Sequence, residues 1–335
     1  MRHDLGIRAQ GNSTCGPAAA LVYIRAVKAS VYLVLATLFW SGNFIVAQAA
    51  VASMTPMDLT FWRWALAAVP LLLLAHFVEK PDWRAVLRRW PVLLLLSVLG
   101  MSGYTLLLYG ALGHTSAMNA SLITAANPAL IVVLAMVLTG ERTTRLGWFG
   151  ICLGLLGVLL VLTRGELQRV ISLSLNIGEL LMIGAILVWG CYTIIARRLE
   201  VPAIAATAVQ VAIAAVTLAP FALAMNVRLP EAPAEAWSLA YIVVFPSLGA
   251  YLLWNLALKT TPPGTAGNYL NLIVVFTAII TVVLGTPLTL VQIAGGVLVI
   301  AGVLLTGMKG QAKPPATAAP NPASDTASGG LAPKA

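Results

Sequence analysis

Charged side chains are scarce in this sequence of 335 residues. Asp, Glu, Lys and Arg together make up 9% of it, whereas about a quarter of the residues of a soluble domain are charged. Apolar residues make up 60%, and the mean hydropathy is +0.92. So few charges cannot cover the surface of a soluble fold of this length. The composition therefore indicates a membrane protein and argues against soluble enzymes and nucleic-acid binders.

Cysteine and histidine are equally rare, with three residues of each type. Cys15, Cys152 and Cys191 have no metal-ligand spacing and form no disulfide framework, so we expect no metal and no cofactor. No paired-carboxylate, Gly-x-Ser-x-Gly or His-Glu motif lies inside an apolar run, which argues against an intramembrane enzyme. A channel is disfavoured because no carbonyl filter loop or charged ring occurs.

Long apolar runs dominate what is present. Each has about the 17–25 residues that a helix needs to cross a bilayer, and uninterrupted runs are typical of helices rather than of barrel strands. The sequence thus predicts an all-α polytopic membrane protein with ten transmembrane helices, and residues 1–26 and 309–335 are predicted to be disordered ends. The predicted spans are 28–50, 56–78, 91–112, 116–138, 146–163, 177–197, 203–225, 237–258, 265–285 and 289–308.

Basic residues are distributed unequally between the two sides of these spans. Sixteen fall in alternate connections and in both ends, and three fall on the opposite side. Because cytoplasmic loops carry the excess of Lys and Arg, both termini are predicted to be cytoplasmic, in a bacterial inner (plasma) membrane. The three on the outer side are Arg164, Arg169 and Arg228.

The two halves of the chain resemble each other. Residues 38–47 align with residues 187–196 at an offset of 149, and three glycines of the first half recur 145 residues later. We therefore divide the chain into repeats at 27–165 and 175–308. Five spans are an odd number, so the second repeat must be inverted in the membrane. Inverted repeats are an architecture of transporters, with the substrate site between the repeats near the midplane.

Three motifs carry a resemblance to a known family: Leu38-Phe39-Trp40-Ser41-Gly42-Asn43-Phe44, Phe61-Trp62-Arg63-Trp64, and Asn127-Pro128-Ala129 followed by Gly140-Glu141. The chain resembles the drug/metabolite transporter superfamily, in its ten-helix branch built from two EamA domains. The second half departs from the pattern, with Leu272-Ile273 in place of Asn-Pro and Gly285-Thr286 in place of Gly-Glu.

This resemblance implies a secondary transporter that exports small molecules by alternating access through a central cavity. The aromatic-rich helices look most like exporters of aromatic and other apolar amino acids. A drug or nucleotide-sugar exporter of the same superfamily is the alternative, although a diphosphate would require more basic residues in the cavity. We expect the lipid bilayer and a small-molecule substrate as partners, no nucleic acid, and a homodimer as an open possibility.

Polar and aromatic residues at mid-depth are the candidate cavity lining. Trp normally prefers the interfaces of a bilayer, so Trp40 and Trp189, at matching depth in the two repeats, favour a polar cavity over plain packing. Amides facing lipid would be costly, although each one could instead hydrogen-bond between helices. The other candidates are Asn43, Tyr104, Asn119, Tyr192, Tyr251, Trp254, Asn268 and Asn271.

Arg63 is the one clear charge at bilayer depth, where insertion scales give a cost of at least about 2.5–3.5 kcal/mol. It could attract a substrate carboxylate or close a gate, or it could hold the bundle together. Pro128 and Pro246 permit kinks in the middle of spans, which could be hinges or static bends.

Carboxylates and histidines are absent from the predicted mid-depth of the other spans. Glu179 begins a predicted helix, where a cap is favoured over a proton carrier. This pattern argues for a uniporter or exchanger over an obligate proton antiporter. The glycines of the fifth and tenth spans predict close helix contact, within the scaffold or at a dimer face.

Overall fold

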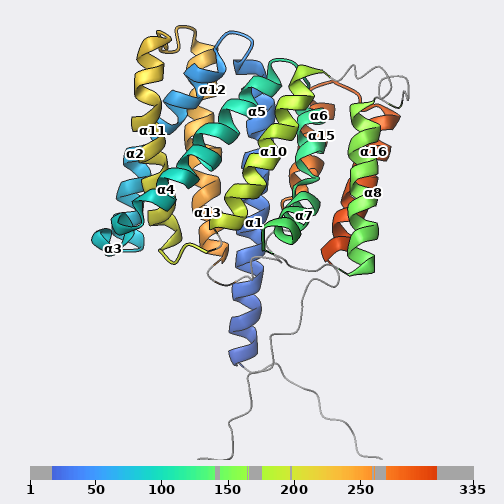
Figure 1. Cartoon of the computed structure of the whole chain (residues 1–335), viewed down its shortest axis with the longest axis horizontal. Helices are drawn as coiled ribbons and strands as arrows, with labels where there is room; N and C mark the ends of the chain where they lie inside the picture. The colour runs from blue at the N-terminus through green and yellow to red at the C-terminus, as the bar shows by residue number, and fades with distance from the viewer. Residues whose placement is uncertain are drawn as a thin grey trace, which may run out of the picture.

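The computed structural model describes residues 17–139, 144–163, 165, 176–196, 198–258, 260 and 269–307. The regular structure within these ranges is helical throughout, as predicted, and the helices form a single bundle (Figure 1). The helices are α1 (Pro17–Ala50), α2 (Pro56–Val78), α3 (Trp83–Arg88), α4 (Trp90–Leu96), η1 (Ser97–Gly103), α5 (Tyr104–Leu112), α6 (Ala117–Thr124), α7 (Asn127–Thr139), α8 (Arg145–Leu162), α10 (Ile177–Ala196), α11 (Ala203–Ala224), α12 (Pro233–Ile242), η2 (Val243–Gly249), α13 (Ala250–Leu258), α15 (Leu272–Val283) and α16 (Leu290–Gly307).

Seven helical stretches in the described ranges are long and apolar enough to cross a membrane. They correspond to the predicted spans one to four and six to eight. Three shorter apolar helices, at Arg145–Val161, Leu272–Val283 and Leu290–Gly302, lie where the fifth, ninth and tenth spans were predicted. The prediction of a helical membrane protein is confirmed.

The first helix begins earlier than the sequence pattern indicated. The structure starts α1 at Pro17, within the segment that the sequence predicted to be disordered up to residue 26. Proline suits the first turn of a helix because its missing N–H would have no partner there. Residues 1–16, and the predicted tail at 309–335, lie outside the described residues.

Two predicted spans contain a π-helical segment at the same position of each repeat. The third span has η1 and the eighth has η2, and the two begin 146 residues apart, at Ser97 and Val243. Pro246 lies inside η2, and Gly100 is the matching residue of η1. Such π-helical turns occur frequently at functional sites. The internal similarity therefore extends to an irregularity of the backbone.

The fourth span is interrupted in the middle. Helix α6 ends at Thr124 and α7 begins at Asn127, with a turn at residues 125–126 between them. Pro128 is the second residue of α7, where its missing N–H costs little. A similar boundary lies 144 residues later, where Asn271 precedes α15. The predicted helix over 116–138 is thus present but broken.

Equivalent helices of the two halves pack against each other. Helix α2 lies on α11 and α8 on α16, at opposite sides of the bundle in Figure 1, while α1 contacts α13 and α15 and α10 contacts α5 and α7. These contacts are related by the internal repeat, because the first helix of each half packs against later helices of the other half. The buried apolar side chains form two main clusters, one around α1, α5, α6 and α10 and one around α2 and α11.

Hydrogen bonds at the helix ends show that matching helices run in opposite directions. Glu79, just after α2, accepts from the N–H groups of Ile204 and Ala205 at the start of α11, at 3.1 and 2.8 Å. Asn176, just before α10, donates to the carbonyl of His114, beyond the end of α5. Gln48, near the end of α1, accepts from Ala117 N at 2.8 Å, so α1 ends close to where α6 begins. Helices α1 and α10 are therefore antiparallel.

The connection between α11 and α12 is tied to the first half by Arg228. Its guanidinium donates to both carboxylate oxygens of Glu235, at 2.9 and 2.8 Å, and to the carbonyl of Ser53 at 2.5 Å. Its backbone N–H donates to Asp58, which also caps α2. The hydrogen bonds with Glu235 raise the pKa of Arg228 above its ordinary value.

Glycines bring α8 and α16 into backbone contact. A Cβ atom at Gly302 would lie 2.5 Å from Gly150 O and Gly154 N, and one at Gly157 would lie 2.7 Å from Gly295 O. Only residues without a side chain allow so close an approach. These two glycine faces meet within the chain, so they do not supply the dimer face that the sequence left open.

Candidate functional site: a central cavity

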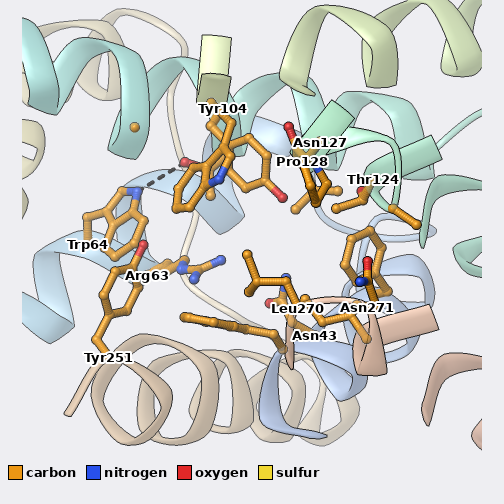
Figure 2. A pocket seen from close by; sticks show the side chains of 18 residues that line it. Asn43, Arg63, Trp64, Tyr104, Thr124, Asn127, Pro128, Tyr251, Leu270 and Asn271 are labelled. Atoms are coloured by element: carbon orange, nitrogen blue, oxygen red, sulfur yellow. Dashed lines mark hydrogen bonds between the residues drawn. The ribbon is translucent and has the colours of Figure 1, made fainter. Parts of the chain in front are cut away.

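A cavity lies between the two halves, with about 730 Å³ of space that no protein atom fills, part of it open to solvent. Side chains from both repeats surround it (Figure 2). Its lining consists of Trp40, Asn43, Phe44, Arg63, Trp64, Gly100, Tyr104, Thr105, Leu108, Thr124, Ala125, Asn127, Pro128, Trp189, Tyr251, Leu270, Asn271 and Ile273.

The structure brings most of the predicted site residues to this one place. Those that line the cavity are Trp40, Asn43, Arg63, Tyr104, Pro128, Trp189, Tyr251 and Asn271. Tyr192 and Trp254 pack behind lining residues rather than on the cavity surface, and Pro246 contributes its carbonyl from η2. Asn268 lies outside the described residues.

One aromatic group is built around Trp40 of α1. The rings of Tyr251 and Trp254 lie 5.8 and 5.4 Å from the Trp40 ring, centroid to centroid, and Trp64 lies 6.5 Å from Tyr251. The indole N–H of Trp40 donates to the carbonyl of Pro246 at 3.2 Å. A tryptophan that the sequence predicts at mid-depth thus finds its acceptor in a carbonyl of the π-helical segment.

A second aromatic group surrounds Trp189 of α10. Its ring lies 4.9 Å from Tyr104 and 5.0 Å from Tyr192. Tyr192 packs over Gly100 of η1, where an added Cβ would collide with its ring. Trp40 therefore contacts η2 of the other repeat directly, whereas Trp189 is linked to η1 of the other repeat through Tyr192.

Arg63 carries the charge of the cavity. It is 4% exposed, and its guanidinium carbon lies 4.4 Å from the Trp64 ring centroid. One terminal N–H donates to the hydroxyl of Tyr109 at 2.6 Å, and that hydroxyl donates to Asn43 at 3.3 Å. In the part of the chain that the structure describes, no carboxylate lies within salt-bridge distance of Arg63, and its Nε has no acceptor. Among the described residues, the cation is therefore held by neutral groups alone.

Asn127 and Asn271 place two further polar groups at the cavity. They are 5% and 7% exposed, and the side-chain oxygen of each has no hydrogen-bond partner among the described residues. Sequence reasoning used Asn127 as a family motif and did not consider it for the lining. Its position beside a mid-span proline was the available signal, because such a proline removes a hydrogen bond and can break a helix.

Trp64 and Tyr109 were also missed. Trp64 was considered only as part of the Phe61-Trp62-Arg63-Trp64 motif, yet it is 1% exposed, lines the cavity and donates to Met101 O and Thr105 Oγ1, both at 3.1 Å. Tyr109 stands beneath Arg63 rather than on the surface of the cavity. Neither position could be inferred from residue type, because both depend on which way the helices face.

Two predicted polar residues have structural partners elsewhere. Asn119 is absent from the cavity lining, and its side-chain oxygen accepts from Gln292 of α16 at 2.9 Å. Glu179 accepts from the backbone N–H of Asn176 at 3.2 Å, while the Asn176 side chain accepts from Gly178 N. This reciprocal pair caps the start of α10, as the favoured interpretation predicted.

An all-helical membrane protein whose two similar halves enclose a central cavity has the architecture of a secondary transporter. Comparison with known proteins identifies the family. The EamA-like transporter family matches residues 27–163 and again 176–308. The chain therefore belongs to the EamA-like transporter family and contains two EamA repeats. It is a transporter and not an enzyme.

Several relatives and a solved structure agree with this assignment. The uncharacterized transporter YyaM of Bacillus subtilis is 30% identical, over 82% of this chain and 92% of that protein. An uncharacterized transporter of Archaeoglobus fulgidus is 32% identical, over 84% and 98%. A probable terminal-alkyne amino-acid exporter of Streptantibioticus cattleyicolor is 27% identical, over 82% and 91%. One crystal structure, 22% identical, covers 83% of this chain and 95% of its own with a TM-score of 0.58, and it shares the fold.

Proposed function

We propose that the protein exports amino acids, chiefly aromatic and other small zwitterionic ones, through the central cavity. The observation that carries this proposal is Arg63, a buried cation in an aromatic cavity with no described carboxylate as its partner. A buried charge without a counter-ion is costly. A substrate carboxylate would supply the missing counter-ion, and the tryptophan and tyrosine rings would pack on an apolar side chain.

The proposed transport cycle is alternating access between two inverted five-helix repeats, ten spans in all. The antiparallel pairs α1 and α10, and α2 and α11, support the inversion. The short helices α8, α15 and α16 would complete the ten spans. With both termini in the cytoplasm, as the excess of basic residues on that side suggests, export would proceed from that side across a bacterial inner membrane.

The choice of amino acids over other solutes has separate support. The probable terminal-alkyne amino-acid exporter of Streptantibioticus cattleyicolor is a relative over most of both chains. A nucleotide sugar is disfavoured because Arg63 is the one cationic side chain in the described lining, whereas a diphosphate needs several. Neither carboxylates nor histidines occur in that lining, which favours facilitated flow or exchange over proton coupling.

The test is flux of radiolabelled amino acids across proteoliposomes that contain the purified protein. Phenylalanine, tryptophan, threonine and lysine are each compared with and without a pH gradient. We expect phenylalanine and tryptophan to be carried without a gradient, and the flux to be lost in Trp189→Ala. Trp237→Ala, at a side chain that is 77% exposed, is the matched control and should retain it. Absence of flux for every amino acid would refute the substrate assignment and favour drugs or sugar conjugates.

A further inference from the structure

We infer that Asn127 and Asn271 together bind the ammonium group of the substrate, while Arg63 on the other side of the cavity binds its carboxylate. This inference rests on the proposed function and adds to it a requirement for two opposite charges on one ligand. Figure 2 shows the guanidinium entering from α2 and the two asparagines lying across the cavity from it. The ligand would therefore be a zwitterion held in one orientation.

The first element of the ammonium site is the break between α6 and α7. Asn127 begins α7, and the next residue, Pro128, has no N–H to offer. Thr124 at the end of α6 also lines the cavity, and its hydroxyl donates to Ala120 O at 2.9 Å. The Asn127 side-chain oxygen lacks a donor among the described residues. The break thus presents oxygen atoms with free lone pairs, which require a hydrogen-bond donor.

The second element comes from the other repeat. Asn271 occupies the N-cap of α15, yet its side chain makes no capping hydrogen bond. Its side-chain oxygen is buried and, within the described ranges, unpartnered as well. A buried acceptor without a donor loses its hydrogen bonds to water and gains none in return, so two such oxygens on one cavity call for an explanation. An ammonium group, with three N–H donors, satisfies both.

Arg63 determines the orientation of the ligand. Its Nε–H lacks an acceptor in the described part of the chain, whereas a terminal N–H is already engaged by Tyr109. A carboxylate beside Nε would accept the hydrogen bond of the Nε–H group and neutralise the charge of the guanidinium. The amino end of α7 is itself weakly attractive to anions. The full charge of Arg63 outweighs this weak attraction. The carboxyl end of α6, which carries the opposite partial charge, also lies at the break and offsets it.

The test is competition against phenylalanine counterflow in proteoliposomes. The probes are 3-phenylpropionate, which lacks the amine, and phenethylamine, which lacks the carboxylate. We expect the inhibitory concentration of each probe to be at least about tenfold higher than that of unlabelled phenylalanine. This is the ratio expected for losing hydrogen bonds to a charged group. Equal inhibition by 3-phenylpropionate would overturn the ammonium site, and equal inhibition by phenethylamine would overturn the role of Arg63. These results need no variant.

Variants then locate the ammonium site. In Asn127→Leu and Asn271→Leu, inhibition by unlabelled phenylalanine should weaken to the level of inhibition by 3-phenylpropionate. The inhibition by 3-phenylpropionate itself should stay unchanged. Asn119→Leu, the same substitution at a buried residue outside the cavity lining, should keep the difference between the two ligands. A difference that persists in both cavity variants would refute the assignment to these asparagines.

Binding, followed as a shift in melting temperature, separates this inference from the proposed function. If phenylalanine is carried but 3-phenylpropionate competes equally, only the inference fails. If phenylalanine binds with the expected preference but is not carried, the proposed function fails and the site assignment stands. If phenylalanine neither binds nor is carried, both fail.

Discussion

The two repeats share a backbone but differ in the chemistry they bring to the cavity. Trp40 and Trp189 match, the segments η1 and η2 match, and Asn127 and Asn271 both stand at the start of a half-helix. Helices α2 and α11 also correspond, and each carries a long polar side chain as its eighth residue. In α2 this residue is Arg63, and in α11 it is Gln210.

The environments of these two residues differ as much as their charges. Arg63 lines the cavity, whereas Gln210 is 2% exposed, stands apart from the lining, and accepts a hydrogen bond from Ser97 at its backbone carbonyl. The comparison shows that repetition of the fold does not impose repetition of the chemistry. A cavity with one cationic wall can hold an asymmetric ligand in one orientation, which a symmetric cavity cannot.

The largest expected effect comes from removing this asymmetry. Arg63→Gln gives both repeats the same neutral side chain, and we expect phenylalanine counterflow to fall about tenfold to a hundredfold, because hydrogen bonds to a charged group are lost. Gln210→Met, the matched change in α11, should leave flux within about twofold. Equal losses in the two variants would show that both positions act through the scaffold.

The second prediction uses the contact between α8 and α16. Gly157 and Gly302 are equivalent residues whose added Cβ atoms would meet backbone at 2.7 and 2.5 Å. We expect Gly157→Ala and Gly302→Ala each to destabilise the protein by about 1–3 kcal/mol, since overpacking forces backbone apart. Unfolding in detergent with increasing denaturant measures this. Gly154→Ala, where the nearest atom is 4.0 Å away, should cost little; a comparable loss there would contradict the packing argument.

The third prediction compares the two tryptophans. Trp40 donates to Pro246, whereas the Trp189 indole N–H has no acceptor among the residues described. Trp40→Phe should therefore reduce stability by about 0.5–1.5 kcal/mol more than Trp189→Phe, because only the former removes a hydrogen bond. Melting curves of the two purified variants give the comparison. Equal shifts would mean that ring packing, not the hydrogen bond, holds α1 against η2.

The smallest effect is expected where α2 and α11 end. The residue after each C-cap has a left-handed backbone, Lys80 with φ 47° and Asn226 with φ 51°. Asparagine tolerates this conformation better than lysine, so Lys80→Asn should stabilise the protein by less than the roughly 1–2 kcal/mol that the left-handed conformation costs an ordinary residue. The reverse change, Asn226→Lys, should destabilise it by a similar amount. A change of the same sign in both variants would rule out the backbone as the cause.

Sequence reasoning predicted the class of the protein well and the site only in part. Scarce charge, long apolar runs and the internal offset indicated a repeated helical transporter. Residues at the centre of a regular helix, such as Trp40 and Trp189, were placed correctly on the cavity. Those near an irregularity were not: Asn119 was chosen for the lining, and Asn127, beyond the break at residues 125–126, occupies it.

Composition and repetition by themselves determined that the chain is a helical membrane transporter, because a charge content of 9%, long apolar runs and two similar halves admit few other folds. Which side chains face the cavity was decided by the tertiary structure. Each residue of an α-helix turns by about 100°, so one turn at residues 125–126 or one π-helical segment redirects every side chain beyond it. Whether a buried polar atom such as Nε of Arg63 finds a partner depends on helices far apart in the sequence, and no local pattern encodes that pairing.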